Sequence, residues 1–140
     1  MTTRVELNFK VPNQTSYLAM IGQMGETLAY SLKNFHGNRK ELAYHLNLVL
    51  TEALTNAICH GNACDPEKYV TIDIAATDKT LVIKVIDQGQ GFDITARDKI
   101  KAAPLDESGR GINIIMKLMD KVSCTREKGM NVLKMTKYLH

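Results

Sequence analysis

Residues 52–62 read EALTNAICHGN and close a long helical pattern. On a helix, Glu52, Asn56 and His60 are four residues apart and lie in one row along one side. At about 100° per residue, Asn56 falls only about 20° from Val49, within the apolar stripe of its own helix. Burial of the Asn56 amide, and of the Glu52 carboxylate at the edge of the stripe, costs free energy unless other polar groups form hydrogen bonds with them. The stretch therefore predicts either a satisfied core asparagine or part of a polar site.

The chain has the composition of an ordinary globular protein. Its 140 residues, 44% hydrophobic and 24% charged, suit one domain with one core. No stretch reaches the roughly 20 apolar residues of a membrane span, and the N-terminus lacks the apolar run of a signal peptide, so we expect a cytoplasmic protein without membrane contact. The three cysteines match no metal spacing and are expected to be reduced thiols. Net charge is +3 with scattered Lys and Arg, so nothing indicates direct binding of nucleic acid.

Hydrophobic periodicity predicts strands and helices in a definite order. Strict alternation over Arg4–Val11 predicts a half-buried strand. Apolar residues at helical spacing predict one helix from Asn13 to about Phe35 and another from Arg39 to Asn62. Strands are expected at Val70–Ile74 and Leu81–Ile86, and the second is almost continuously apolar, which is typical of a central strand.

The remainder of the chain predicts one more helix and a closing hairpin. The helix opens at Gly109, and the hairpin joins Lys121–Thr125 to Asn131–Tyr138. Residues 88–108 show no periodicity, and so long a connection in a small domain is usually functional, which favours a lid. The order predicts an α+β two-layer sandwich: a mixed, mostly antiparallel sheet of about five strands with helices on one face. Residues 1–140 then form a single domain.

A second motif follows the expected central strand. Asp87 ends that strand, and Gly89 and Gly91 follow at alternate positions. Glycine lets the backbone turn sharply and approach a ligand closely. Asp87 then offers an acceptor at the floor of a pocket, for which the amino group of a purine is a natural partner. The other explanation is ordinary hairpin-turn chemistry.

A third motif, Gly109-Arg110-Gly111-Ile112, opens the helix of the second half. Backbone N–H groups and the positive end of the helix dipole form a phosphate site at such a terminus. Arg110 either reaches a terminal phosphate or stays a solvated cation. Ordinary capping of the helix by Ser108 is the alternative reading of the motif.

Together and in this order, the motifs resemble the N, G1 and G2 boxes of the ATPase superfamily of gyrases, histidine kinases, MutL proteins and Hsp-type chaperones. The resemblance covers about residues 4–138. The short single-domain form and the Glu-Ala-Leu-Thr-Asn-Ala run resemble one branch, the bacterial anti-sigma-factor serine kinases. The matching boxes are Glu52-x-x-x-Asn56-x-x-x-His60-Gly61, Asp87-x-Gly89-x-Gly91-Phe92 and Gly109-Arg110-Gly111-Ile112.

This resemblance implies a Bergerat-type ATPase fold, with ATP and Mg²⁺ as cofactors. In that family the Asn matching Asn56 binds Mg²⁺, the Glu matching Glu52 is the general base, and the Asp matching Asp87 binds adenine. The nucleotide site then also includes Gly89, Gly91, Gly109, Arg110 and Gly111. The resemblance implies that the protein is a protein-serine kinase and an anti-sigma factor. It also implies that the protein forms a homodimer. Such a protein phosphorylates an anti-sigma-factor antagonist with a STAS-type domain and sequesters a sigma factor.

The chain departs from the family at its last hairpin turn. Members commonly carry Gly-Thr there, with the Thr near adenine, whereas this chain has Gly129-Met130-Asn131. That contact is therefore either missing or made differently. Two other functions stay open: a nucleotide-binding adaptor without kinase activity, and the ATPase domain of a split histidine kinase. Glu52 favours the kinase over the adaptor, and the lack of a dimerisation helix pair disfavours the histidine kinase.

Overall fold

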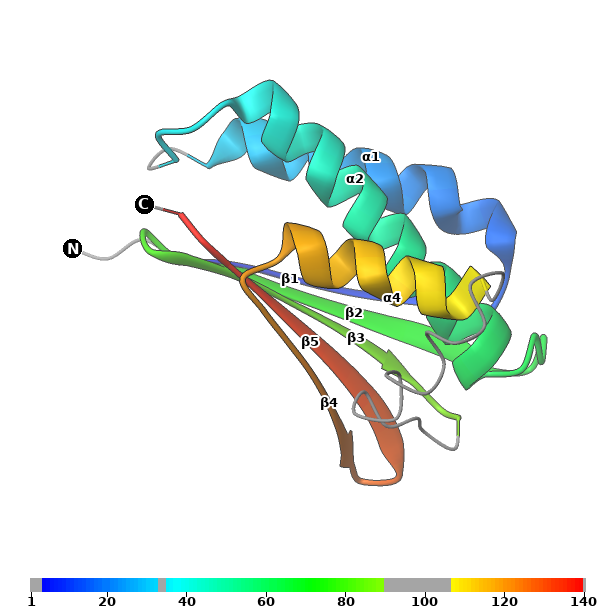
Figure 1. Cartoon of the computed structure of the whole chain (residues 1–140). Helices are drawn as coiled ribbons and strands as arrows, with labels where there is room; N and C mark the ends of the chain where they lie inside the picture. The colour runs from blue at the N-terminus through cyan, green and yellow to red at the C-terminus, as the bar shows by residue number, and fades with distance from the viewer. Residues whose placement is uncertain (1–3, 33–34, 90–106, 140) are drawn as a thin grey trace.

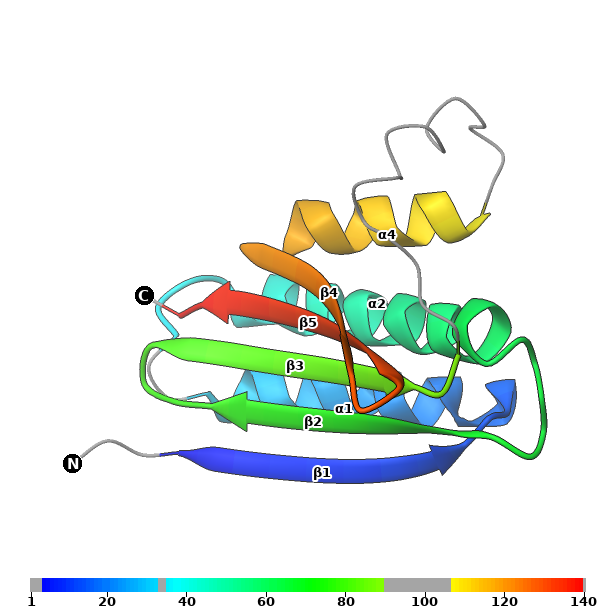
Figure 2. The same cartoon turned by 90° about the horizontal axis from the view of Figure 1, so that it is seen from below.

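The structure is a computed structural model that describes residues 4–32, 35–89 and 107–139. Its described helices lie together over one face of a five-stranded sheet, and the opposite face carries none of them (Figures 1 and 2). In chain order the elements are β1 (Val5–Pro12), η1 (Thr15–Tyr17), α1 (Leu18–Ser31), α2 (Arg39–Asn56), η2 (Ala57–Gly61), β2 (Tyr69–Ala76), β3 (Thr80–Asp87), α4 (Glu107–Leu118), β4 (Lys121–Glu127) and β5 (Met130–Tyr138).

Each strand of the sheet runs antiparallel to the strands that it pairs with. The strand order is β1-β2-β3-β5-β4, which makes β3 the central strand as expected. β3 and β4 point the same way, but β5 lies between them and pairs antiparallel with both. The predicted α+β sandwich is confirmed, with the correction that the described sheet is entirely antiparallel rather than mixed.

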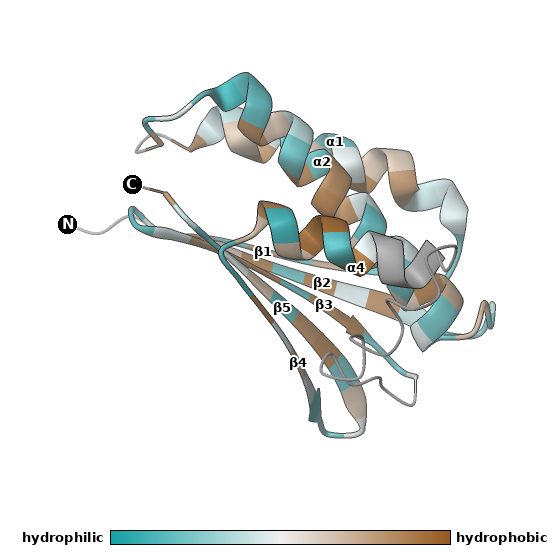
Figure 3. Ribbon diagram, viewed as in Figure 1, coloured by the Kyte–Doolittle hydropathy of each residue, from teal (hydrophilic) through white to brown (hydrophobic). Residues whose placement is uncertain are grey.

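The core lies between the sheet and the helices. β2 and β3 alternate between half-buried and buried residues along their whole length. Figure 3 shows hydrophobic and hydrophilic residues alternating along the strands. Since a shift of one residue would turn every buried side chain toward solvent, this burial fixes the register of the strands. The buried apolar side chains include Val70, Ile72, Ile74, Leu81, Ile83 and Val85 of the sheet and Ile21, Leu46, Leu50, Leu54 and Ile115 of the helices.

Two glycines let α1 pack closely against α2. A Cβ at Gly25 would lie 2.8 Å from Leu50 Cδ1 and 3.0 Å from the carbonyl oxygen of Leu46. A Cβ at Gly22 would meet the side-chain oxygen of Asn47 at 2.7 Å. These glycines weaken the intrinsic helicity of α1, and the close approach of the two helices explains their presence.

Two expected helix boundaries are corrected. The first helix begins not at Asn13 but with the 3₁₀ turn η1, and the buried side chain of Asn13 donates a hydrogen bond to the carbonyl oxygen of Asp65 at 2.9 Å. The second helix is α-helical only to Asn56 and then becomes the π-helical turn η2. The extra residue of the π turn takes His60 out of the expected row, and its side chain is exposed rather than on the apolar stripe.

None of the described helices is long and apolar enough to cross a membrane. The thiols of Cys59, Cys64 and Cys124 form no disulfide, in agreement with the expected reduced state.

Candidate functional site

The last turns of α2 lie against the N-terminal part of α4. α4 begins at Glu107, two residues before the expected start at Gly109. A Cβ at Gly111 would lie 2.6 Å from Glu52 Oε2 and 3.6 Å from Asn56 Nδ2. Glycine at position 111 therefore leaves the space that these two polar side chains occupy. The first and third sequence motifs consequently meet in one place.

The end of β3 packs directly on the π turn that follows α2. A Cβ at Gly61 would overlap the carboxylate of Asp87 and lie 2.6 Å from its Oδ1. A Cβ at Gly89 would overlap the carbonyl oxygen of Gly61 and lie 2.8 Å from its Cα. Gly89 is therefore required by the close approach of the Gly61 backbone, and Gly61 by the close approach of the Asp87 carboxylate. This contact brings the second motif to the first.

Asp87 is held by one of its two carboxylate oxygens. The residue is 9% exposed and is the last residue of β3. Its Oδ1 accepts hydrogen bonds from the backbone N–H of Gly89 at 2.8 Å and from Asn131 Nδ2 at 2.7 Å. Among the described residues, no donor is hydrogen-bonded to Oδ2, the carboxylate oxygen that lies nearest Gly61.

Asn56 presents a buried amide nitrogen that has no hydrogen-bond partner among the described residues. The residue is 9% exposed, and its Nδ2 makes no hydrogen bond within the described part of the chain. Buried polar groups in proteins are nearly always hydrogen-bonded, so this exception needs an explanation. Rotation of the amide by 180° would present its oxygen in the same place. The amide lies beside Glu52 and Gly111, and a ligand bound there would supply the missing partner.

Asn62 supports the site and was not identified from the sequence. It is fully buried, and its Nδ2 donates to Asn13 Oδ1 at 3.1 Å and to the carbonyl oxygen of Tyr69 at 2.9 Å. Its Oδ1 accepts the backbone N–H of Gln88 at 2.8 Å. Asn62 thereby fastens the end of α2 to the start of β2 and to the exit of β3. In the sequence, the only indication of this role is that Asn62 is an amide residue at the end of the first motif.

The structure thus brings together five residues of the expected site: Glu52, Asn56, Asp87, Gly89 and Gly111. Gly109 and Arg110 lie in the first turn of α4, and the side chain of Arg110 is outside the described part. Gly91 and most of the expected lid at residues 88–108 also lie outside the described residues.

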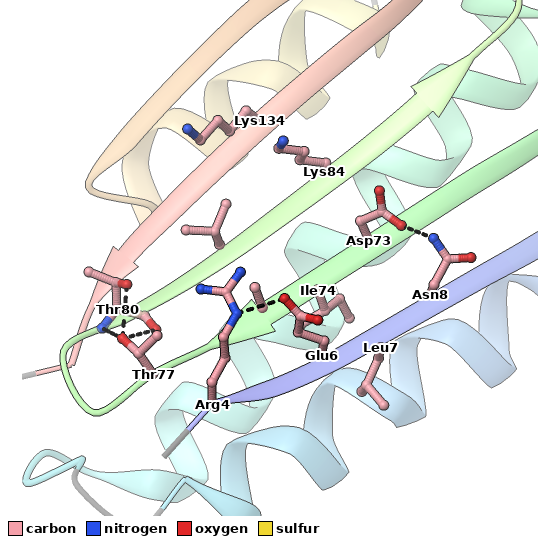
Figure 4. Close-up of a pocket in the computed structure, with 12 residues that line it drawn as sticks. Arg4, Glu6, Leu7, Asn8, Asp73, Ile74, Thr77, Thr80, Lys84 and Lys134 are labelled. Atoms are coloured by element: carbon pink, nitrogen blue, oxygen red, sulfur yellow. Dashed lines mark hydrogen bonds and ion pairs between the residues drawn. The ribbon is translucent and has the colours of Figure 1, made fainter. Parts of the chain in front are cut away.

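A groove of about 690 Å³ lies on the opposite, helix-free face of the sheet and contains none of these residues. Glu6, Asn8 and Asp73 line it from β1 and β2. Lys84 of β3 and Lys134 of β5 project side by side at its other edge (Figure 4). Asn8 Nδ2 donates a hydrogen bond to the Asp73 carboxylate across the strands.

Comparison with known families identifies the class of the domain. Residues 17–137 match the family model described as histidine kinase-like ATPase domain. The chain belongs to this family. The superfamily indicated by the three boxes is therefore confirmed, and membership of an ATPase family implies that the chain binds ATP.

Solved structures show the same fold. A chain in the crystal structure of the SiaB-SiaC complex from Pseudomonas aeruginosa is similar with a TM-score of 0.62 and 16% sequence identity. The match covers 94% of this histidine kinase-like ATPase domain and 89% of the other chain. No curated protein sequence matches the chain.

The two buried asparagines should differ sharply in their contribution to stability. In the nucleotide-free protein we expect Asn56→Ala to change the free energy of unfolding by less than about 1 kcal/mol, because Nδ2 has no hydrogen bond to a described residue to lose and alanine is a good helix former. Asn62→Ala should cost about 2–4 kcal/mol, because it leaves several buried groups unpaired. Denaturant unfolding of both variants measures the difference. Equal losses would contradict the view that Asn56 is kept for a ligand.

Proposed function

We propose that the protein is an Mg²⁺-dependent protein-serine kinase and anti-sigma factor that acts in the cytoplasm. It phosphorylates an anti-sigma-factor antagonist with a STAS-type domain and sequesters a sigma factor. The observation that carries the proposal is the buried Nδ2 of Asn56, which has no hydrogen-bond partner among the described residues and lies beside the Glu52 carboxylate and the N-terminal part of α4. A carboxylate, an amide and a helix N-terminus in one place match the needs of phosphoryl transfer.

Asn56 and α4 would hold the charged end of the nucleotide. Mg²⁺ prefers oxygen ligands and usually takes only one or two from the protein, with water and phosphate oxygens completing its shell. The side-chain oxygen of Asn56 can be one such ligand, and the metal neutralises charge on the phosphates. The N–H groups in the first turn of α4, where Gly109 and Arg110 lie, have no partner within the helix and suit phosphate oxygens.

Asp87 would select the base. Its Oδ2, which accepts no hydrogen bond from the described residues, is an acceptor in a buried position, which suits the exocyclic amino group of adenine. Guanine presents a carbonyl oxygen at the corresponding position, and two acceptors repel each other. Gly61 and Gly89 have no side chains and leave the carboxylate approachable.

Glu52 would act as the general base. It lies one helical turn before Asn56, so a hydroxyl directed at the terminal phosphate would come within its reach. The serine oxygen forms a bond to the γ-phosphorus as the bond from that phosphorus to the ADP oxygen breaks. The hydroxyl proton passes to the Glu52 carboxylate, and ADP leaves. A pure adaptor would have no use for a carboxylate in this position, which favours the kinase over the adaptor.

A protein partner is supported by the fold comparison. The similar chain was solved within the SiaB-SiaC complex, so a relative of this fold assembles with another protein. An antagonist protein as substrate fits that likeness. The split histidine kinase remains the alternative enzyme, and the chemical identity of the phosphorylated residue separates the two.

The protein is also proposed to form a homodimer through the helix-free face of the sheet. Lys84 and Lys134 are directly opposite each other in the register, and within the described residues neither makes an ion pair. Like charges opposite each other destabilise a sheet. Asp73 lies opposite Lys84 on the other side. In the proposed dimer the helix-free faces of two copies meet. The two-fold axis runs parallel to β2 and β3 and lies between these strands. Each Asp73 then lies over Lys84 of the other copy.

Nucleotide affinity should depend on metal through Asn56. We expect calorimetry to show that the unmodified protein binds ATP more tightly with Mg²⁺ than with a chelator. In Asn56→Ala most of that difference should disappear, because the proposed ligand oxygen is gone. Gln23→Ala, at an exposed position on α1, is the control. Tight ATP binding that neither chelator nor Asn56→Ala affects would exclude the metal role.

Glu52 should matter for transfer and not for binding. We expect Glu52→Gln to leave Mg–ATP and partner binding nearly intact while single-turnover transfer from labelled ATP to the antagonist falls about 10²–10⁴-fold, the usual contribution of a general base. Acid stability of the labelled product distinguishes phosphoserine from phosphohistidine. Undiminished transfer by a well-folded Glu52→Gln variant would exclude the base. No transfer by the unmodified protein across candidate antagonists would favour the adaptor.

The proposed dimer should respond to a charge swap. Lys84→Glu should shift sedimentation toward the monomer, because Glu at position 84 would face Asp73 of the second copy. Adding Asp73→Lys to that variant should restore the dimer, since the pair is then reversed. Lys40→Glu makes the same charge change on α2 and serves as control. A monomer at all concentrations, or a dimer indifferent to Lys84→Glu, would reject this interface.

A further inference from the structure

The hairpin of β4 and β5 reaches the functional site through a row of three polar residues. Asp87 of β3 is paired in the register with Asn131 of β5, and Asn131 is paired with Arg126 of β4. Directly opposite residues point to the same face of a sheet. The row therefore runs straight across three neighbouring strands and ends at the Asp87 carboxylate. None of these contacts follows from the three sequence motifs alone.

Arg126 determines which way the Asn131 amide points. Arg126 Nη1 donates to Asn131 Oδ1 at 2.8 Å, so the amide oxygen faces the guanidinium. The amide nitrogen must then face the other way, and it donates to Asp87 Oδ1 at 2.7 Å. Without the guanidinium, the two ends of an asparagine amide could exchange by rotation, and an oxygen turned toward Asp87 would repel it.

The guanidinium of Arg126 also binds two backbone carbonyl groups, one after β3 and one in the turn between β4 and β5. Arg126 Nη1 donates to the carbonyl oxygen of Gly89 at 2.9 Å, and Nη2 donates to that of Gly129 at 3.1 Å. Gly129 lies in the hairpin turn with a positive φ of 78°, a conformation that favours glycine. One side chain thus connects the exit of β3 to the turn between β4 and β5.

We propose that Arg126 and Asn131 are positioning residues that determine base selectivity by fixing the carboxylate of Asp87. Oδ1 is occupied by the donors of Gly89 and Asn131, and Oδ2 is left as a fixed acceptor. A fixed acceptor selects a base with an exocyclic amino group and rejects one with a carbonyl there. Members of the family commonly have a Thr near adenine at this turn. In this chain Asn131 takes its place and acts through the carboxylate of Asp87 instead. The inference rests on the proposed function, because it assumes that Asp87 meets the base.

The chain contains a matched control pair. Asn8 and Asp73 are also an asparagine and an aspartate directly opposite each other, on β1 and β2, and are joined by the same amide-to-carboxylate hydrogen bond. That pair lies in the groove on the helix-free face (Figure 4), and Asp87 is not among the residues that line this groove. Asn8→Ala therefore removes the same chemistry from the same kind of cross-strand pair without touching the site.

The experiment compares Mg–ATP and Mg–GTP affinities of the full chain by calorimetry. Asn131→Ala should weaken ATP binding roughly 10-fold or more, as expected for a charge-assisted hydrogen bond that positions a ligand group, and should narrow the ratio of ATP to GTP affinity. Arg126→Gln should act in the same direction. The double variant should lose less than the two single losses combined, because both residues act through one carboxylate. Asn8→Ala should leave both affinities unchanged.

Two further variants keep the inference separate from folding and from the proposed function. Asn131→Thr retains a hydroxyl donor in a residue suited to a strand, so it should keep more ATP affinity than Asn131→Ala while melting at a similar temperature. ATP binding that Asp87→Asn abolishes but Asn131→Ala and Arg126→Gln leave within twofold would overturn this inference alone. An unmodified protein that binds ATP and GTP equally, or binds neither, would overturn both the role of Asp87 and the inference.

Discussion

The site depends on the direct contact between the end of β3 and the π turn that follows α2. A Cβ at Gly89 would overlap the backbone of Gly61, and a Cβ at Gly61 would overlap the carboxylate of Asp87, so neither position has room for a side chain. This contact sets the position of Asp87 relative to α2. Asn62 stabilises it by bonding to the backbone N–H of Gln88 and the carbonyl oxygen of Tyr69. Because the interior is close-packed, a methyl group at either glycine would separate the two elements.

Two asparagines six residues apart differ in how their side chains are hydrogen-bonded. Asn62 has three hydrogen bonds and holds the backbone, whereas Asn56 Nδ2 lies buried with none among the described residues. An unpartnered buried amide costs free energy in the unliganded protein. Proteins retain such costs chiefly where function needs them.

The two faces of the sheet carry different sets of side chains. The inner face packs against α1, α2 and α4 and carries Asp87, Asn131 and Arg126 at the end nearest the site. The helix-free face carries the groove with opposed lysines and a carboxylate. Alternation along each strand makes this division possible, because successive side chains point to opposite faces. A change on one face can therefore leave the other intact.

The sequence by itself determined the features that depend on local pattern. Helical spacing placed Glu52 and Asn56 on one side of α2, alternation located the strands, and the end of a continuous apolar run placed Asp87 at a strand terminus. The order of the elements was enough for the α+β sandwich. These features follow from periods of a few residues, which a single sequence displays directly.

Only the tertiary structure decided the contacts between distant segments. The π turn exposed His60, which a continuous α-helix would have kept in the row of Glu52 and Asn56. Asn131 reaches Asp87 across 44 residues of sequence, and it does so because β5 lies between β3 and β4. Strand order and register are set by the burial of all the strands together against the helices. No local pattern predicts which distant residue pairs with Asp87, because that pairing depends on how the whole sheet is assembled.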